Sequence, residues 1–245
     1  NKLNSKKATG HDKISVKMLK IASPVVSQHI SNIINRSFNE STFPDKMKIA
    51  QVVPVHKKSS LLEKSNYRPV SLLPIISKLH ERAIYDQLLN HFNHYFNPLL
   101  SAFRPKFGCN TALLKIAEDW KSHLDQNKYA AAILMDLSKA FDCLPHDLLL
   151  LKLKNYNISE NALKLINSYL SNRKQCVKIG SSSSEYLEII KGVPQGSILG
   201  PLMFNIFIND IFYFINKGSL CNYADDNTVF YSSNSVEDLV STLEN

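Results

Sequence analysis

Two apolar runs of this sequence end in carboxylates. Residues 131–135 (AAILM) lead directly into Asp136, and residues 220–224 (LCNYA) lead into Asp225 and Asp226. A buried strand that finishes in a carboxylate presents the charge at the rim of a sheet, because an unpaired charge is too costly to bury. We therefore expect both runs to be strands whose acidic ends meet. The alternatives are a turn or cap acid at Asp136 and an ordinary hairpin tip at the acidic pair, since Asp favours turns.

Carboxylates that meet in this way repel one another, and a divalent cation removes the repulsion. Mg²⁺ prefers oxygen ligands, and two such ions roughly 3.5–4 Å apart can activate a hydroxyl and stabilise a leaving pyrophosphate. Adjacent strand residues point to opposite faces, so we predict Asp225 as the direct ligand and Asp226 as the supporting one. The pattern indicates phosphoryl transfer with two Mg²⁺ ions, Mn²⁺ being the alternative metal.

The net charge of +8 is unevenly distributed. Residues 1–82 hold 15 Lys and Arg against 5 Asp and Glu, whereas the remaining 163 residues hold 14 basic and 16 acidic side chains. A basic N-terminal part beside a slightly acidic C-terminal part suits a polyanion groove that leads to a metal site. A basic protein with scattered surface lysines remains the alternative.

The cysteines and the apolar stretches bear on compartment. The four cysteines are far apart and form no C-x-x-C pair, which disfavours structural zinc and disulfides. This fits a reducing intracellular compartment: the cytoplasm, the nucleus or both. The longest apolar stretch, residues 198–215, contains Gly200, Pro201 and Asp210, and therefore indicates a buried helix rather than a membrane span. No apolar run follows the first lysines as it would in a signal peptide.

Hydrophobic spacing predicts a chain of mixed helices and strands. Helices are expected at residues 75–92, 111–124, 145–155, 160–170 and 199–216 and from Ser235 onward. Strands are expected at residues 49–58 and 129–135, with hairpins at residues 173–191 and around Asp225. We expect a polar loop at residues 61–74, Pro24 in a first helical turn and Pro54 in an edge strand. The irregular order favours the α+β class, with an antiparallel sheet and helices packed on one face.

Seven blocks, in order, carry a resemblance to a known family. They are residues 1–20, 43–58, 65–73 (SNYRPVSLL), 101–105 (SAFRP), 136–142 (DLSKAFD), 192–201 (GVPQGSILGP) and 223–226 (YADD). A Tyr-x-Asp-Asp box alone is a weak signal, but the ordered set resembles the reverse transcriptase domain of non-LTR (LINE-type) retrotransposons. The sequence departs from the family pattern at residues 9–13 (TGHDK), at Met47, where Trp is common, and after Arg104, which lacks the usual Gly-rich turn.

The resemblance implies a right-hand polymerase with fingers and palm. Residues 1–128 would form the N-terminal extension and fingers, with part of the fingers also inserted at about residues 145–190. Residues 129–245 would form the palm with the catalytic motifs and an antiparallel palm sheet. The chain begins with Asn and ends inside a helical pattern, so we expect a single reverse transcriptase domain, 1–245, truncated at the C-terminus, with the thumb missing.

The resemblance also assigns roles to residues. It gives the two Mg²⁺ ions to Asp136, the Leu137 carbonyl, Asp225 and Asp226. It places Phe141 under the incoming sugar, where a bulky ring would clash with a 2′-hydroxyl; an ordinary core aromatic is the alternative. The remaining nucleotide contacts are assigned to Lys57, Arg68, Gln195 and Gly196.

The function implied by the resemblance is RNA-directed DNA polymerase activity of a retrotransposon. The enzyme, a nucleotidyltransferase, would use an RNA template, a DNA primer and deoxynucleoside triphosphates, with no membrane partner and an oligomeric state left open. An RNA-templated RNA polymerase is one alternative. A catalytically inactive or domesticated nucleic-acid-binding relic is the other.

Overall fold

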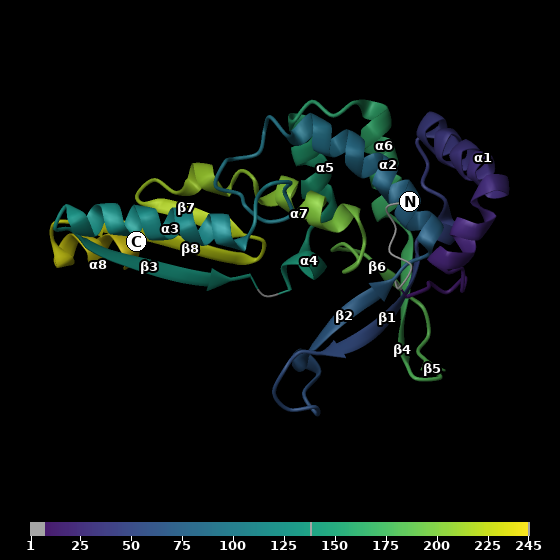
Figure 1. The fold of residues 1–245 in the computed structure, drawn as a ribbon, viewed down its shortest axis with the longest axis horizontal. Helices are drawn as coiled ribbons and strands as arrows, with labels where there is room; N and C mark the ends of the chain where they lie inside the picture. Colours follow the sequence, from purple (N-terminus) through teal and green to yellow (C-terminus); the bar gives the residue numbers. More distant parts are fainter. Residues whose placement is uncertain (1–7, 138, 245) are drawn as a thin grey trace. The chain divides into compact units, whose positions relative to one another are not determined.

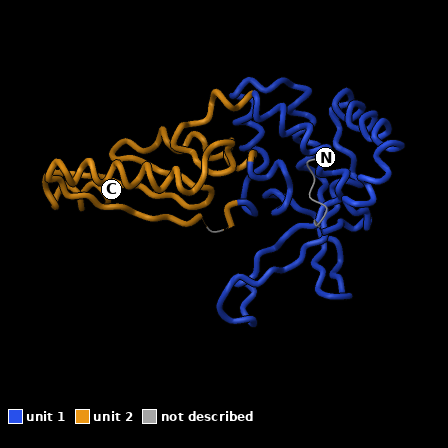
Figure 2. The backbone as a smooth tube through the Cα atoms, in the orientation of Figure 1, with its two compact units in different colours: residues 1–90, 141–201 blue, residues 91–140, 202–245 orange. Residues whose placement is uncertain are grey.

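The computed structural model describes residues 8–137 and 139–244 (Figure 1). Residues 1–7 of the expected N-terminal extension, Ser138 of the DLSKAFD block and residue 245 lie outside the described part. The chain forms two compact units, residues 1–90 with 141–201 (unit 1) and residues 91–140 with 202–245 (unit 2), coloured separately in Figure 2. The three boundaries fall within helices α2 (Ile75–Phe92), α4 (Ala140–Cys143) and α7 (Leu199–Ile208).

The first helix of unit 1 contains a proline in its interior. Helix α1 runs over Val16–Glu40, so the prediction that Pro24 lies in a first helical turn was wrong. Proline has no N–H to give to the carbonyl four residues earlier. The hydroxyl of Ser23 donates to that carbonyl, on Lys20, at 2.9 Å. A neighbouring side chain thus satisfies the acceptor that the proline leaves free.

The sheet of unit 1 is built on strand β1 (Ile49–His56). Strand β1 pairs antiparallel with β2 (Tyr67–Leu72) and parallel with β4 (Arg173–Ile179). The polar loop predicted at residues 61–74 is therefore wrong over Tyr67–Leu72, where β1 supplies the hydrogen bonds that make a strand. The sheet is completed by β5 (Ser182–Ser183) and β6 (Leu187–Ile189), which both pair with β4. Two 3₁₀ turns, Asp45–Met47 and Lys64–Asn66, precede β1 and β2.

Two prolines share one rung of the β1–β2 ladder, where Pro54 lies opposite Pro69. The N–H of Lys57 donates to the carbonyl of Asn66 at 2.8 Å, so the hydrogen-bonded rungs fall at odd positions of β1. The proline rung is a non-hydrogen-bonded one, and neither proline removes a bond between these strands. Strand β1 is internal over Ile49–Val52, where β4 pairs with it. Pro54 lies beyond that pairing and opposes only Pro69, as its predicted edge position requires.

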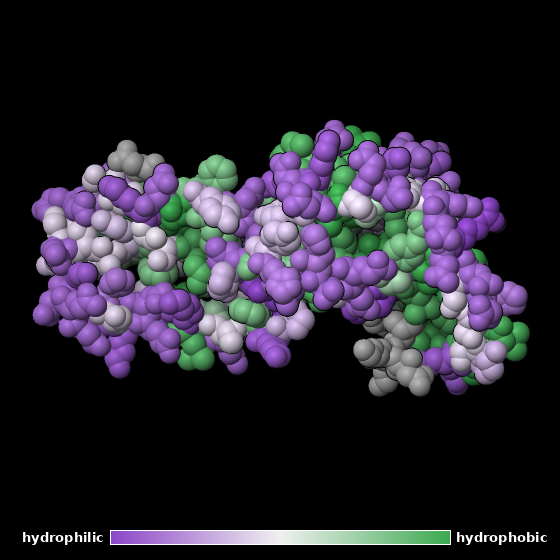
Figure 3. Space-filling view, turned by 90° about the horizontal axis from the view of Figure 1, so that it is seen from above, coloured by the Kyte–Doolittle hydropathy of each residue, from purple (hydrophilic) through white to green (hydrophobic). Residues whose placement is uncertain are grey.

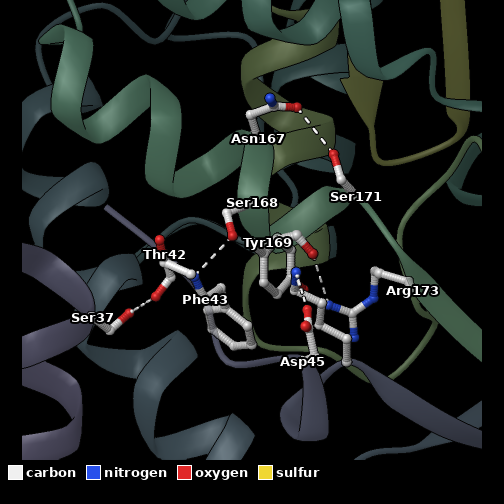
Figure 4. A network of polar contacts seen from close by, with 10 residues as sticks. Ser37, Thr42, Phe43, Asp45, Asn167, Ser168, Tyr169, Ser171 and Arg173 are labelled. Carbon is white, nitrogen blue, oxygen red and sulfur yellow. Dashed lines mark hydrogen bonds and ion pairs between the residues drawn. The ribbon is translucent and has the colours of Figure 1, made fainter. Parts of the chain in front are cut away.

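Helix α6 (Glu160–Leu170) is tied to the segment that leads into β1 and to the first residue of β4 (Figure 4). The N–H of Phe43 donates to the hydroxyl of Ser168 at 2.9 Å. On the other side, Arg173 donates from Nη1 to the carbonyl of Tyr169 at 3.0 Å. Helix α5 (His146–Asn155) precedes α6, and both match the predicted ranges to within one residue. The core of unit 1 includes Phe43, Leu73, Ile75, Leu149, Leu153, Tyr169 and Leu170.

Unit 2 contains an antiparallel three-stranded sheet in the order β3-β8-β7. The strands are β3 (Tyr129–Asp136), β7 (Ser219–Tyr223) and β8 (Asp226–Ser233). Helix α3 (Cys109–Asp125) packs against β3 and β7, and α8 (Val236–Glu244) packs against β8 and β3 (Figure 1). The predicted strand, hairpin and flanking helices are confirmed here, and the fold is a mixed α and β one.

Helix α7 ends earlier than predicted. It stops at Ile208 and is followed by a 3₁₀ turn over Ile211–Phe214, whereas a helix to residue 216 was expected. The side chain of Asn209 accepts the N–H of Asn97 at 2.8 Å and donates to the carbonyl of Tyr95 at 2.9 Å. These tertiary bonds hold the chain at the point where the helix stops.

Apolar side chains fill both units but also reach their surfaces between hydrophilic bands (Figure 3). The core of unit 2 includes Phe92, Leu100, Met203, Phe204, Ile206 and Phe230. Over residues 8–137 and 139–244, no helix is both long enough and apolar enough to cross a membrane.

Candidate active site

The acidic ends of β3 and β8 meet, as the sequence predicts. Asp136 and Asp226 are direct partners in the antiparallel β3–β8 ladder, and Asp226 is also the partner of Tyr223 in β7. Directly opposed residues project from the same face of a sheet. Next to them, the N–H of Leu137 donates to the carbonyl of Asp225 at 3.1 Å. The structure thus brings together the four residues assigned to the metals.

The two adjacent aspartates occupy different kinds of position. Asp226 is the first residue of β8, whereas Asp225 lies with Ala224 in the two-residue turn between β7 and β8. Ala224 has a φ of 59° and Asp225 does not have a positive φ, a pattern typical of a type II′ hairpin turn. The direction of Asp225 is therefore not set by strand alternation, and it is Asp226 that the register puts opposite Asp136. The ranking of Asp225 above Asp226 stays a prediction.

Two asparagines that the sequence analysis did not single out support this turn. Nδ2 of Asn222 donates to the carbonyl of Ala224 at 2.8 Å and to Oδ1 of Asn227 at 2.9 Å. Asn227 in turn donates to the carbonyl of Asp225 at 3.2 Å. Both asparagines are buried. Their signal in the sequence is symmetry, because each lies two positions from the two-residue turn and they must pair in any such hairpin.

The four residues assigned to the metals offer ligand atoms that suit a divalent cation, and the backbone brings them close together. Three carboxylates and the Leu137 carbonyl supply oxygen ligands of the kind that Mg²⁺ prefers. That carbonyl accepts the N–H of Ala140 at 3.2 Å and keeps one lone pair. Asp136 and Asp226 are exposed, and Asp225 is half-buried. In the described ranges, no three His, Cys, Asp or Glu side chains already form a metal cage, so these carboxylates would have to turn toward one another to coordinate.

The predicted phosphate-binding residues lie on the β1–β2 hairpin of unit 1. Lys57 directly follows β1 and opposes Asn66, while Arg68 opposes Val55. This register places Lys57 and Arg68 as diagonal neighbours on one face, at a separation of about 7–8 Å in a regular ladder. Both side chains are exposed. A basic pair that can reach one polyphosphate is therefore available here.

The other nucleotide residues lie where three segments of unit 1 are tied together. The N–H of Val193 donates to the carbonyl of Phe141 at 2.8 Å, and the N–H of Ser71 in β2 donates to the carbonyl of Gln195 at 2.7 Å. Gly196 has a φ of 120°, and a Cβ there would lie 2.8 Å from the Ser71 carbonyl oxygen. Only glycine suits this position, because β2 passes so close.

A buried acid fixes the end of this loop at the start of α7. The carboxylate of Glu81 accepts the N–H groups of Ile198, at 2.6 Å, and Leu199, at 3.3 Å. Burial raises the pKa of Glu81, while the charge of Arg173 and these hydrogen bonds oppose the rise. The acid therefore satisfies donors at a buried helix N-terminus that would otherwise have no partner.

Comparison with known proteins identifies the family. Residues 55–245 match the family described as "Reverse transcriptase (RNA-dependent DNA polymerase)". In Drosophila melanogaster, the chain is 29% identical, over 98% of its length, to the probable RNA-directed DNA polymerase from transposon X-element. It is 30% identical over 94% to that from transposon BS, and 28% identical over 99% to the RNA-directed DNA polymerase from mobile element jockey. The chain spans about a quarter of these relatives (27%, 26% and 28%).

A solved structure shares the fold. An apo telomerase from Candida tropicalis, truncated from its C-terminal domain, superposes with a TM-score of 0.58 at 12% identity, over 89% of this chain and 50% of that one. The reverse transcriptase resemblance drawn from the seven ordered blocks is confirmed. The chain belongs to the reverse transcriptase (RNA-dependent DNA polymerase) family, and the Drosophila relatives named above are RNA-directed DNA polymerases of non-LTR retrotransposons.

Proposed function

We propose that the protein is an RNA-directed DNA polymerase that extends a DNA primer along an RNA template with deoxynucleoside triphosphates. The observation that carries the proposal is the rung formed by Asp136 and Asp226, with Asp225 in the adjoining turn. Family membership supports the same reaction. The enzyme would act within a retrotransposon, as the named relatives do.

Two Mg²⁺ ions would be held by Asp136, Asp225, Asp226 and the Leu137 carbonyl. When bound, they would supply charge neutralisation at the transferred phosphate and activation of the attacking hydroxyl. The side chains themselves supply the negative site that concentrates such ions, and the turn beneath them limits how far Asp225 can move. Replacing Mg²⁺ by Mn²⁺ in titrations would determine which metal and how many ions the protein takes.

The nucleotide would be bound by residues of unit 1. Arg68 and Lys57 would grip the triphosphate, because a guanidinium donates two parallel hydrogen bonds to phosphate oxygens and an ammonium adds a point charge. Phe141 would exclude a 2′-hydroxyl by its bulk. Gln195 and Gly196 would line the nucleotide and template side of the loop.

The two units correspond, in this proposal, to the parts of a right-hand polymerase. Unit 1 would be the fingers and the N-terminal extension, and unit 2 would be the palm that carries the carboxylates. The segment 91–128, which the sequence prediction assigned to the fingers, would then belong to the palm. Residues 141–144 and 191–201, which it assigned to the palm, would belong to the fingers. We propose a reducing intracellular compartment, supported by the four free cysteines.

The test is Mg²⁺-dependent primer extension by the full-length protein that contains this chain. Wild-type protein should extend a DNA primer on RNA, and Asp225→Ala should lose this activity by several orders of magnitude. Asp147→Ala, at an exposed acid of α5, is the matched control and should retain it. Unchanged extension by Asp225→Ala would refute the assignment. Salt-sensitive RNA binding without any Mg²⁺-dependent incorporation would identify the protein as a binding relic instead.

A further inference from the structure

The side chain of Gln195 is held by an acid to which the family resemblance gives no role here. Nε2 of Gln195 donates to both carboxylate oxygens of Asp142, at 2.9 and 3.0 Å. Asp142 directly follows Phe141 in α4, and both partners are half-buried in unit 1. Hydrogen bonds to a carboxylate are shorter and stronger than those between neutral groups. The contact joins residues 53 positions apart in the sequence.

This contact decides which end of the Gln195 amide is available. An ionised carboxylate can only accept hydrogen bonds, so the amide must turn its NH₂ group toward Asp142. The other end, Oε1, is an acceptor and is left for another partner. Without Asp142, the two ends of the amide would be nearly equivalent in shape, and the group could bind in either orientation.

The backbone around this pair is fixed as well. The Gln195 carbonyl is bonded to β2 through Ser71, and the Phe141 carbonyl is bonded to Val193. Gly192, with a φ of 80°, lies so close to the backbone of Asp142 that there is no room for a Cβ. Asp142 and Gln195 are thus held on two segments that cannot move apart easily.

The pair borders a space that a ligand group can enter. Asp142 and Gln195 line a cavity of about 200 Å³, together with Pro69, Ser71, Gln175 and Lys191. The cavity adjoins β2 at Pro69 and Ser71, whose side chains project from the face of the strand opposite that of Arg68. An amide whose orientation is set would present one defined hydrogen-bonding function at this surface.

We propose that Asp142 is a positioning residue. By holding the amide nitrogen of Gln195, it makes Gln195 offer Oε1, an acceptor, to a donor group of the incoming nucleotide. This inference rests on the proposed function, because the nucleotide contact of Gln195 belongs to that proposal.

Steady-state primer extension by the full-length protein tests the inference. Asp142→Ala would free the whole Gln195 side chain to sample other rotamers as well as both amide orientations, so KM for the deoxynucleotide should rise about tenfold. The value of kcat should change much less, because the lost binding is shared by the substrate and the transition state. Asp142→Asn keeps the shape, but its amide can either accept from or donate to Gln195. It should therefore raise KM less than Asp142→Ala does, without restoring the wild-type value. Asp147→Ala is the control and should leave both constants unchanged.

A double-mutant cycle separates positioning from mere structural support. In a Gln195→Ala background, Asp142→Ala should raise KM no further, because there is no amide left to orient. Equal effects of Asp142→Ala in both backgrounds, or an unchanged KM in the single variant, would overturn the role of Asp142. If Asp142→Ala does not fold, the near-isosteric Asp142→Asn takes its place in the cycle.

A binding measurement keeps this result distinct from the proposed function. The dissociation constant of dTTP can be titrated on the protein bound to an RNA template and a dideoxy-terminated DNA primer, where no turnover occurs. The same tenfold weakening, absent in the Gln195→Ala background, is expected. The protein could bind dTTP tightly, with the non-additivity expected for the Asp142–Gln195 pair, and yet fail to extend a normal primer. That result would count against the proposed polymerase function but support the positioning role of Asp142. Absence of any nucleotide binding would overturn both.

Discussion

The turn that carries Asp225 should depend on the amide nitrogen of Asn222. This side chain is completely buried, and it donates to the Ala224 carbonyl at 2.8 Å and to Asn227 at 2.9 Å. Asn222→Asp keeps the shape but replaces the donor by a second acceptor. Both hydrogen bonds would become contacts between oxygens, in a place that water does not reach.

The size of the effect can be bounded from two sides. Leaving a buried partner unsatisfied costs about 1–3 kcal/mol, so two lost bonds cost about 2–6 kcal/mol. The new carboxyl can escape by taking up a proton, which restores one donor. At pH 7 this costs about 4 kcal/mol, from about 1.4 kcal/mol per pH unit above an ordinary Asp pKa near 3.9. We therefore expect a loss of about 2–4 kcal/mol at pH 7 that shrinks toward pH 4.

Hydrogen exchange followed by mass spectrometry can locate this loss. Amides of β7 and β8 should exchange about 30- to 1,000-fold faster in Asn222→Asp, while peptides of unit 1 keep their rates. Primer extension should fall in parallel, because the turn no longer holds Asp225. Asn216→Asp, at an exposed position of unit 2, is the control. Unchanged protection of β7 and β8, or equal deprotection of unit 1, would show that the asparagine pair does not support the turn.

Three further predictions concern unit 1. Burial lowers the pKa of His80 to about 4, so the stability from its neutral ring is complete above its unfolded pKa of about 6.5 and is lost as pH falls toward 4. Between pH 6.5 and pH 4, the unfolding free energy of His80→Phe should therefore rise by about 3 kcal/mol relative to that of the wild type. The raised pKa of Glu81 has the opposite pH dependence, but it affects both proteins equally and cancels in the difference. Parallel pH profiles of the two proteins would contradict the reasoning. Phe141→Ala should raise incorporation of ribonucleotides relative to deoxynucleotides in primer extension, whereas an unchanged ratio would favour the RNA polymerase alternative. Gly196→Ala should slow extension at least tenfold, because its Cβ would force β2 away from the loop; wild-type rates would mean that the loop adjusts freely.

The sequence was most informative where structure depends on local signals. An apolar run that ends in Asp136, and another that leads into Asp225 and Asp226, were enough to predict that the acidic ends meet. Hydrophobic spacing likewise predicted helices α2 and α6 with the observed bounds. In these segments, propensity, periodicity and turn chemistry agree with the final fold.

Predictions failed where a distant or side-chain partner decides the structure. Strand β2 was read as a loop because Pro69 and its polar neighbours give a weak strand signal, and only pairing with β1 makes it a strand. Pro24 was placed in a first helical turn because helix propensity counts only the missing N–H of proline. It does not take into account that the Ser23 hydroxyl can donate to the Lys20 carbonyl instead. Asn209 continued a helical pattern in the sequence, but its amide is committed to residues 95 and 97.

The supporting residues of the site escaped detection for a related reason. Asn222 and Asp142 are ordinary polar residues in the sequence, with no spacing that marks a ligand set. Their importance comes from the partners that the fold gives them, a turn carbonyl in one case and the amide of Gln195 in the other. For Asn222 the sequence offers only its symmetric position about the turn, and the role of Asp142 becomes visible only once the burial and the hydrogen bonds are known.

The parallel pairing of β1 with β4 has a consequence for synthesis of the chain. Ile49 pairs with Lys174, 125 positions later, so at about 5–20 residues per second β1 waits roughly 6–25 s on the ribosome for this neighbour. During that time the nascent β1–β2 hairpin has two open edges. Pro54 and Pro69, on a non-hydrogen-bonded rung, remove a donor from each outer edge. The prolines that weaken the strand signal thus protect the unfinished protein from recruiting a stray strand.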